Sequence, residues 1–477
     1  MRDKEGGRTM RFLEIQKDRK GSLAQQIFEQ FRVKILDGEM AADEKLPSTR
    51  ELSHMLNVSR NTVLAAYEML ASEGCVTNVP ASGVYVKEGA ARTELSEETA
   101  GAARMRDDEE ESGALEDVVS FDSGVPALDL IPRNGWLRAA NTAFREAPLE
   151  AFGYDDPRGR RELRALLASY LQRTRGIRCH PDRVLVTSGT KQGLTLLAKT
   201  FLSPGSEVFI EDPSNDNVRR IFSYHSQHIV PIPVDCEGIR TDLLPEDKRP
   251  SCIFVTPSHQ FPLGGSLSIQ RRVALVQYAQ QRDSYIVEDD YDSEFVYSGH
   301  PVRSLHELDR ERVVYVGTFS KILFPSVRLG YLVLPYSLVD RCREWKRLGD
   351  HHSNSLYQLA LARFIESGEL ERHILRMKKI YRKRRDLLID LLKRAFAGSV
   401  RIFGETAGMH LVAEFEEVVF SPETLERLRR ARVAVVPVEE HAIIKGKHLG
   451  RAILGYAHLP PELLHEGVAR LRRALER

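Results

Sequence analysis

The stretch GTFSKILFPSVRLGY, residues 317–331, places one lysine directly after a short apolar run. The run RVVYV is typical of a buried strand, and Lys321 follows it beside two hydroxyl residues, Thr318 and Ser320. A second cation, Arg328, comes seven residues later. An amine and a guanidinium at the end of a buried strand fit a nucleophilic lysine that works beside an anionic group such as a phosphate.

Four further apolar runs resemble the one before Lys321, because each ends in a polar or glycine cluster and helical patterns follow most of them. They read DRVLVTSG, SEVFIEDP, CIFVTPSHQ and SYIVEDDYD. Alternating strands and helices predict an α/β domain with a mostly parallel central sheet. Ligands of such sheets bind beyond the carboxyl ends of the strands, which is where the unusual residues of this chain gather.

Two other strand ends carry chemistry that complements the lysine. In VTSGTKQGL a helix is expected to begin at Gly189, Thr190 and Lys191, and the exposed N–H groups of a helix start bind anions. IVEDDYDSEF places Tyr291 within an acidic run. A solvated loop and a metal site are alternative interpretations of that run, although no histidine stands at ligand spacing and we expect no metal. A lysine for an aldehyde, an acid for a ring nitrogen, and donors for a phosphate are what pyridoxal phosphate needs.

The N-terminal residues 1–86 predict a separate winged helix-turn-helix domain. A helix is expected at the apolar spacing of SLAQQIFEQFRVKIL, two capped helices follow, and CVTN and GVYVK are expected to form a β-hairpin. The second capped helix is the element that enters the DNA major groove in such domains. The residues predicted to contact DNA are Ser48, Arg50, Ser59, Arg60, Asn61 and Thr62. A small helical protein-interaction domain is the alternative.

An acidic segment separates this domain from the rest of the chain. Residues 87–119 contain the block DDEEE and few aromatic or β-branched residues, which predicts an extended linker, with an acidic surface helix as the alternative. Residues 120–477 then form the α/β domain. The formal net charge of +1 argues neither for nor against nucleic acid.

The cysteines and the apolar segments of the sequence indicate the cellular compartment of the protein. Five scattered cysteines without a C-x-x-C pair fit reduced thiols rather than disulfides or a zinc cluster. The first residues lack the apolar segment of a signal peptide, and no run approaches the about 20 apolar residues that span a bilayer. These features predict a cytoplasmic protein with no membrane partner.

Two groups of motifs resemble known families. The pattern LPSTREL followed by VSRNTV resembles the GntR class of bacterial repressors. GYDDPRGRRELR at residues 153–164, then SGT, D-x-Y and S-K with the later arginine, resemble the class I group of fold-type-I aminotransferases. The combination, together with TPSHQFPLGG, resembles the MocR/GabR family of bacterial transcriptional regulators. This resemblance implies a fold-type-I domain with a smaller C-terminal α/β subdomain.

The resemblance also implies roles for single residues. Lys321 would form the aldimine with pyridoxal 5′-phosphate, Asp289 would pair with the pyridinium nitrogen, and Tyr291 would hydrogen-bond the phenolic oxygen. The phosphate would be held by Gly189, Thr190, Lys191, Thr318, Ser320 and Arg328. Tyr154 would reach the phosphate of the partner subunit in a head-to-tail, domain-swapped homodimer, and Arg451 would grip the carboxylate of an amino-compound effector.

The predicted function is a regulator of operator DNA that senses an amino compound, or pyridoxal phosphate itself, through Lys321. An aminotransferase with an appended DNA-binding head is the alternative function, and a repressor whose body only dimerises is a third possibility. Two features depart from the family pattern. The wing tip NVPASG lacks basic residues. In the run EDPSNDNVRR, with Asn215 and Asn217, Asn215 stands where an aromatic is usual, which argues against 4-aminobutyrate as the effector.

Overall fold

The structure is a computed structural model that describes Leu13, Ile15 and residues 22–90, 117–299 and 302–476. The chain divides into two compact units, residues 1–114 and 115–477. The greater part of the predicted linker, residues 91–116, lies outside the described residues, so its extended or helical state and its bounds stay predictions. In the described residues no helix is long and apolar enough to cross a membrane.

The first unit contains the predicted three helices and hairpin. Its elements are α1 (Leu23–Leu36), α2 (Thr49–Met55), α3 (Arg60–Ser72), β1 (Val76–Val79) and β2 (Gly83–Val86). The two strands pair antiparallel, with Val76 opposite Val86. This arrangement is the winged helix-turn-helix that the sequence predicts.

Side-chain caps and one compact core fix the angle between these helices. The Ser48 hydroxyl accepts from the N–H of Glu51 and the Glu51 carboxylate accepts from the N–H of Ser48, a capping box that starts α2. Ser59 caps α3 in the same way, through the N–H of Thr62. Beneath them an apolar cluster packs the helices together; its fully buried members include Ile27, Phe31, Ile35, Leu52, Val63 and Leu70.

An eight-stranded sheet forms the centre of the second unit, in the order β4-β11-β10-β9-β8-β5-β6-β7. The strands are β4 (Val184–Thr187), β5 (Glu207–Asp212), β6 (His228–Asp235), β7 (Gly238–Ile239), β8 (Cys252–Val255), β9 (Tyr285–Asp290), β10 (Val313–Thr318) and β11 (Gly330–Val333). The strands β10, β9, β8, β5 and β6 run parallel, while β11 is antiparallel to both of its neighbours. The sheet is therefore mostly parallel, as predicted.

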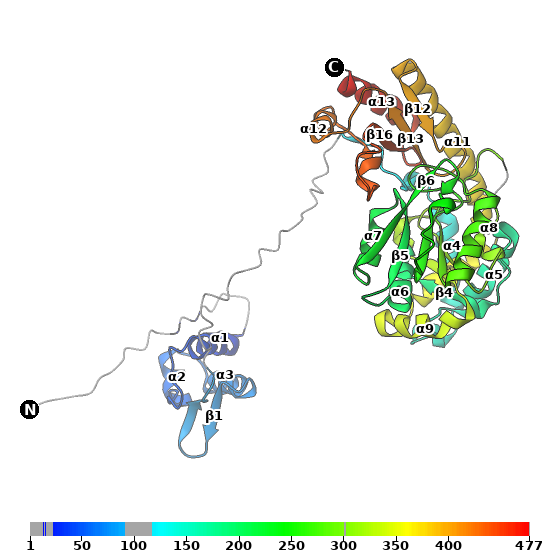
Figure 1. Ribbon diagram of the computed structural model, residues 1–477. Coiled ribbons are helices and arrows are strands. Elements are labelled where there is room, and N and C mark those ends of the chain that lie inside the picture. Colours follow the sequence, from blue (N-terminus) through cyan, green and yellow to red (C-terminus); the bar gives the residue numbers. More distant parts are fainter. Residues whose placement is uncertain (1–12, 14, 16–21, 91–116, 300–301, 477) are drawn as a thin grey trace, which may run out of the picture. The chain divides into compact units, whose positions relative to one another are not determined.

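Helices of the same unit pack around this sheet (Figure 1). They are α4 (Arg133–Glu146), α5 (Arg161–Arg175), α6 (Thr190–Phe201), α7 (Asp216–Ser223), α8 (Ile269–Arg282), α9 (Tyr336–Asp350) and α10 (Ser355–Glu366). The helix α6 begins directly after β4, because Gly189 at its N-cap takes a φ of 108° that a residue with a side chain rarely adopts. This turn puts the N-terminus of α6 at the carboxyl end of the sheet.

A smaller subdomain follows the long helix α11 (Glu369–Phe396) and lies beside the large sheet in Figure 1. It contains a four-stranded antiparallel sheet in the order β12-β13-β16-β15. Its elements are β12 (Val400–Phe403), β13 (His410–Phe415), α12 (Pro422–Arg430), β14 (Val433–Ala434), β15 (Val436–Pro437), β16 (Arg451–Gly455) and α13 (Pro461–Leu475). The short strand β3 (Val119–Ser120) joins it by parallel pairing with β14.

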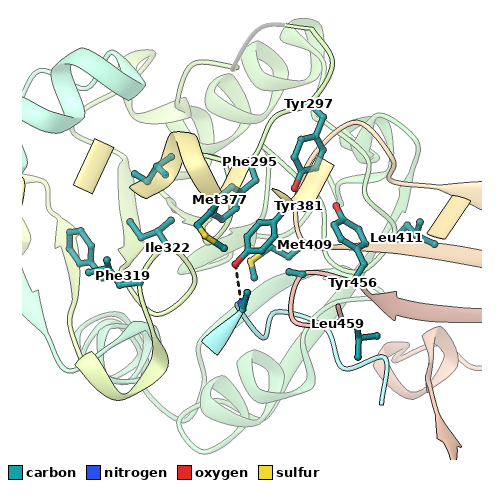
Figure 2. Packing of buried hydrophobic residues seen from close by; sticks show 14 of the residues in the cluster. Phe295, Tyr297, Phe319, Ile322, Met377, Tyr381, Met409, Leu411, Tyr456 and Leu459 are labelled. Atoms are coloured by element: carbon teal, nitrogen blue, oxygen red, sulfur yellow. Dashed lines mark hydrogen bonds between the residues drawn. The ribbon is translucent and has the colours of Figure 1, made fainter. Parts of the chain in front are cut away.

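One continuous apolar core ties the smaller subdomain to the larger one (Figure 2). Phe295 and Ile322 come from loops of the large sheet, whereas Met377 and Tyr381 come from α11 and Leu411 comes from β13. The Tyr381 hydroxyl accepts from the N–H of Ala127 at 3.0 Å. The shared core positions the small subdomain against the carboxyl ends of the large sheet's strands.

Candidate functional site

A cavity of about 270 Å³ opens at the carboxyl ends of β9 and β10. Residues from the acidic run, the lysine stretch and the start of α6 meet there, although they are far apart in sequence. The predicted residues that line the cavity are Thr190, Lys191, Asp289, Tyr291, Thr318, Ser320, Lys321 and Arg328. The structure therefore brings together eight of the ten residues predicted to hold the cofactor.

The acidic run of β9 divides its side chains between the two faces of the strand. Glu288 points away from the cavity, where it accepts hydrogen bonds from the N–H groups of Leu305 and His306 at 3.1 and 3.2 Å. Asp290 also has partners of its own, the Arg175 guanidinium at 2.6 Å and the Tyr315 hydroxyl at 2.5 Å. Successive residues of a strand face opposite sides, so the residue between them faces the cavity.

Asp289 is that residue, and no hydrogen bond or ion pair reaches its carboxylate within the described part of the chain. Its side chain is 8% exposed, it lines the cavity, and its Oδ1 has no hydrogen-bond partner among the described residues. Burial raises the pKa of the Asp289 carboxyl to about 7, with Asp290 and Asp292 acting in the same direction and Lys321 opposing them. A buried acceptor without a donor costs free energy, which marks this oxygen as a place for a ligand N–H.

Lys321 lies opposite this carboxylate. Its Nζ donates to the carbonyl oxygen of Gly124 at 2.6 Å, a residue that also lines the cavity. Burial lowers the pKa of the lysine ammonium, while Asp292 and Asp289 raise it. A lowered pKa favours the neutral amine, which is the form that attacks a carbonyl carbon.

The anion-binding end of the cavity combines a helix start with a guanidinium. A Cβ added to Gly189 would lie 3.2 Å from Nη2 of Arg328, so the absence of a side chain lets the guanidinium approach the turn. Thr190 and Lys191 are the first residues of α6, whose N–H groups and dipole favour an anion. Arg328 pairs with no carboxylate among the described residues and is exposed towards the cavity.

A buried lysine, Lys346, is linked through Gln192 to the turn between β4 and α6. Lys346 is fully buried, and its Nζ donates to Gln192 Oε1 at 2.9 Å and to Asp350 Oδ2 at 2.7 Å. The same oxygen of Gln192 accepts from the N–H of Ser188 at 2.8 Å. Lys346 was not among the predicted residues, because it stands 154 positions from Gln192 and carries no motif of its own.

Two histidines near Tyr291, His259 and His410, were also not among the predicted residues. His259 Nδ1 lies 3.1 Å from the Tyr291 hydroxyl and 3.0 Å from Asp292 Oδ2. The His410 ring lies with its centre 5.0 Å from that of His259 and is tilted by 46° to it, and burial lowers the pKa of His410 to about 3. Ligand atoms of His259, Asp292 and His410 lie within 4.8 Å of one another, a spacing that metal ions accept. Only the folded chain shows this, since these residues come from three segments.

The residues predicted to contact DNA lie on α2 and α3 and at the starts of these helices. Arg50, Arg60 and Asn61 are exposed, and the Arg60 Nε donates to the Thr49 hydroxyl at 3.1 Å, which holds its side chain across the two helices. Ser48, Ser59 and Thr62 take part in the two helix caps, which leaves them less free for DNA.

A cation also stands beside the wing, although the tip has none. Lys45 pairs with Tyr85 in an isolated bridge, and its ammonium lies 5.7 Å from the centre of the Tyr85 ring. A Cβ on Gly83 would come within 2.7 Å of Lys45 Cε. The sequence places Lys45 far from the hairpin, so its position on the wing could be recognised only in the structure.

Comparisons with known proteins match both units. Residues 23–86 match the family of bacterial regulatory proteins, gntR family, and residues 116–471 match aminotransferase class I and II. The chain is 34% identical over 475 residues to the probable rhizopine catabolism regulatory protein MocR of Rhizobium meliloti, which covers 97% of this chain and 95% of that protein. It belongs to the MocR/GabR family of transcriptional regulators.

Other relatives of this MocR/GabR-family regulator are a second regulator and an enzyme. The HTH-type pyridoxine biosynthesis transcriptional regulator PdxR of Corynebacterium glutamicum is 32% identical over 371 residues, which are 78% of this chain and 79% of that protein. The solved multiple substrate aminotransferase of Thermococcus profundus superposes with a TM-score of 0.70 at 29% identity, over 76% of this chain and 92% of that one. The MocR/GabR-family chain is thus a DNA-binding regulator with an aminotransferase-like domain.

Besides Gly189, which forms the turn next to Arg328, two predicted site residues of the regulator lie outside the cavity lining. Arg451 stands opposite Glu414 in the register of β16 and β13, and its Nε donates to Glu414 Oε1 at 2.9 Å. Its guanidinium also packs 5.1 Å from the centre of the Phe403 ring. Tyr154 is 86% exposed and stacks on His351 at 4.9 Å. Their predicted roles toward an effector and a partner subunit remain predictions.

Part of the cavity lining belongs to the small subdomain or packs against it. Phe261 and His410 line the cavity, and Phe261 packs against a cluster that contains Val438 and Ile453. Asn215, which departs from the family pattern, also lines the cavity, where its Oδ1 accepts from the N–H of Asn217 at 3.0 Å and caps α7. The asparagine thus has a local structural role that an aromatic could not fill.

The cavity of this MocR/GabR-family regulator fits the cofactor that the fold-type-I aminotransferase family implies. The unpaired Oδ1 of Asp289 matches a protonated ring nitrogen, and Lys321 matches an aldehyde. Gly189, Thr190 and Arg328 form a cradle for a phosphate. The family therefore implies pyridoxal phosphate, and the residues present agree with it.

Proposed function

We propose that this regulator holds pyridoxal phosphate on Lys321 and that the state of the cavity controls its response to operator DNA. One observation carries the proposal, the buried and unpaired Oδ1 of Asp289 in a cavity that also contains Lys321 and Arg328. A protein that only dimerised through this domain would gain nothing from a buried unpaired carboxylate, because such a group lowers stability.

Each polar residue of the cavity has a task toward the cofactor. Bound pyridoxal phosphate supplies an electrophilic aldehyde carbon and an electron-withdrawing ring. Asp289 would keep a proton on the ring nitrogen, and the Tyr291 hydroxyl would bind the phenolic oxygen. The phosphate would be held by Gly189, Thr190, Lys191, Thr318, Ser320 and Arg328.

The compound that the regulator senses is an amino compound or pyridoxal phosphate itself. The position of Arg451 supports pyridoxal phosphate. Lys191, Lys321 and Arg328 are the cations among the described residues that line the cavity, and the cofactor's phosphate and aldehyde would use all three. Arg451, the residue expected to bind an effector carboxylate, is paired with Glu414. An amino acid would have to break that ion pair before it could use the arginine.

The proposal includes a homodimer, in which Tyr154 reaches the phosphate of the partner subunit. Apolar side chains are exposed on α4 and on the 3₁₀ turn Leu149–Phe152, next to Tyr154 in sequence; they are Leu137, Phe144, Leu149 and Phe152. Soluble proteins seldom leave such a group uncovered. A second copy of the chain would cover this group of side chains. The two copies would form a head-to-tail, domain-swapped homodimer that carries two DNA-binding heads.

The visible absorption of the purified protein, mixed with pyridoxal phosphate and then titrated with a panel of amino acids, tests the proposal. We expect a new visible band on loading, a change in affinity for an operator selected from random DNA, and no further change with amino acids. A band that shifts and persists with one amino acid would identify that compound as the effector. Bleaching with release of a keto acid would favour the alternative function, an aminotransferase. A protein that never develops a band would refute the cofactor proposal.

A further inference from the structure

A buried histidine stands between Tyr291 and a carboxylate, outside the set of residues that the family resemblance assigned. His259 is 2% exposed and Asp292 is 1% exposed. The Nδ1 atom of His259 lies 3.0 Å from Asp292 Oδ2 and 3.1 Å from the Tyr291 hydroxyl oxygen. A single nitrogen is therefore within hydrogen-bond distance of two oxygens.

The chemistry of these three groups determines where the protons are. Burial, with Asp292 and Asp289 nearby, raises the pKa of Tyr291 well above its ordinary value, so the phenol keeps its proton. A carboxylate oxygen accepts hydrogen bonds, so we assign the proton between His259 Nδ1 and Asp292 Oδ2, which lie 3.0 Å apart, to the nitrogen. The Tyr291 oxygen can then only accept from His259, and its own proton remains free for another acceptor.

The opposite side of the imidazole supports a neutral ring. The Nε2 atom has no hydrogen-bond partner among the described residues, and it faces backbone: a Cβ on Gly264 would lie 3.3 Å from it. A protonated Nε2 would bury an unsatisfied charged N–H, which is costly. A Cβ on Gly408 would come within 2.4 Å of Nδ1 and 2.5 Å of Asp292 Oδ2, so the glycine makes room for the pair.

We infer that His259, oriented by Asp292, is a positioning residue that turns the Tyr291 hydroxyl proton into the cavity, toward the phenolic oxygen of pyridoxal phosphate. This inference rests on the proposed cofactor. A hydroxyl that donates to that oxygen stabilises its ionised form, so the histidine controls the pH at which the loaded lysine gains or loses its proton. Without His259 the Tyr291 proton would be free to turn toward Asp292.

The unloaded protein allows a first test that needs no cofactor. Histidine-selective ¹⁵N NMR distinguishes the two tautomers of a neutral imidazole, and His259→Gln identifies the signal by its disappearance. We expect a proton on Nδ1 and a shift of that signal in Tyr291→Phe and in Asp292→Asn. A proton on Nε2, or a signal that Tyr291→Phe leaves in place, overturns the inference. A signal that moves on addition of EDTA would assign the cluster to a metal ion and overturn it too.

The loaded protein gives the second test, in which the pH midpoint of the visible absorption is the readout. His259→Phe should raise the midpoint by about one pH unit, the effect of losing one hydrogen bond to a charged group. Tyr291→Phe should raise it by a similar amount, and the double variant should show no further rise. His259→Gln keeps an N–H donor and should restore the midpoint, which a merely structural role would not predict.

A matched control separates this effect from general loss of packing. His373 is another buried histidine, 6% exposed, on α11 and outside the cavity lining, so His373→Gln should leave the midpoint unchanged. Additive shifts in the double variant, or an unchanged midpoint in His259→Phe, overturn the inference. A wild-type protein without a visible band refutes the proposed cofactor instead, and the tautomer in the unloaded protein still decides whether His259 orients Tyr291.

Discussion

Asp289 and Asp290 are consecutive residues of β9, yet their carboxylates have opposite environments. The Oδ2 of Asp290 is bound by the Arg175 guanidinium at 2.6 Å, although its Oδ1 has no partner, whereas no hydrogen bond or ion pair among the described residues reaches the Asp289 carboxylate. The alternation of a strand produces this difference. The Asp290 carboxylate is used in bonds to Arg175 and Tyr315, and the Asp289 carboxylate remains available to a ligand.

The pH dependence of the free energy of unfolding should show that burying the ionised Asp289 carboxylate destabilises the fold. Its folded-state pKa of about 7 lies above the ordinary 3.8, so the folded state holds the proton more tightly. The stability that this gives is full below pH 3.8 and is lost as the pH rises through 7. In the unloaded protein, Asp289→Asn should therefore increase the free energy of unfolding at pH 8, by about 1–3 kcal/mol, and should change it little at pH 4. Urea unfolding at the two pH values measures this.

The same variant should bind the cofactor more weakly, because the amide cannot hold a proton on the ring nitrogen as a carboxylate does. We expect the dissociation constant for pyridoxal phosphate to rise about tenfold or more, equivalent to about 1.4 kcal/mol. Asp290→Asn is a poor control, since it leaves Arg175 unpaired. A variant that is neither stabilised when unloaded nor weakened in loading contradicts the role of Asp289.

Lys321→Ala should separate DNA binding from ligand response. The DNA-binding unit folds around its own core and does not contain the lysine, so affinity for operator DNA should be retained. The visible band and any cofactor-dependent change in DNA affinity should disappear. Lys199→Ala is the matched control, because that lysine of α6 packs over Trp345, outside the cavity lining. A ligand response that survives in Lys321→Ala would exclude the lysine as the sensor.

Arg60→Ala should weaken binding to DNA by about 1–3 kcal/mol if the side chain contacts a base. If it contacts a phosphate, the loss should be equal for all sequences and should reduce the salt dependence by about one ion. Fluorescence anisotropy at several salt concentrations distinguishes the two. Arg32→Ala, which removes an exposed ion pair with Glu73 on the same unit, is the control and should have little effect. Equal losses in both variants would speak against a specific contact by Arg60.

Arg451→Gln and Glu414→Gln should behave as two halves of one ion pair. Each should lower the free energy of unfolding by about 0.5–1 kcal/mol, and the double variant should cost less than their sum. Cofactor loading should not change, because neither residue lines the cavity. If Arg451→Gln instead abolishes a spectral response to an amino acid, Arg451 binds the effector and the vitamer is not the sole signal.

Phe144→Asp should disrupt the proposed dimer. Phe144 and Phe152 pack edge to face with ring centres 5.5 Å apart, and both are more than half exposed. A charge there would be buried in the interface, so we expect a monomer by light scattering and weaker cofactor binding through the loss of Tyr154 from the partner. Leu243→Asp changes another exposed apolar residue outside this surface and should leave the mass unchanged. A Phe144→Asp protein that stays dimeric would exclude this surface.

The large-scale architecture was readable from the sequence because its signals are local. Ser48 and Ser59 are N-cap residues and therefore predict where α2 and α3 begin. The strand that precedes Lys321 is recognisable as an uninterrupted run of buried residues. The strands β6, β7 and β11 were not predicted. β7 and β11 are short, β6 alternates with prolines, and β11 follows the lysine turn so closely that it looked like its continuation.

The candidate site was predictable where motifs are contiguous and not where contacts are long-range. The motif around Lys321 and the D-x-Y of Asp289 and Tyr291 led to cavity residues. The support of Gln192 by Lys346 and the approach of His259 to Tyr291 depend on how strands and loops pack, which spacing does not encode. Arg451 shows the converse: its place before a strand fits a family position, but the cross-strand register gives it Glu414 as a partner.

The chain enters the second unit very close to its reactive lysine. β3 pairs with β14 of the small subdomain, and within four residues of Ser120 the same backbone reaches Gly124, whose carbonyl accepts the Nζ proton of Lys321. A nitrogen that held the cofactor covalently would keep at most one proton, so loading would change this short hydrogen bond. The first residues of the second unit therefore include an acceptor, the Gly124 carbonyl, whose hydrogen bond with Lys321 would change when the cofactor is loaded.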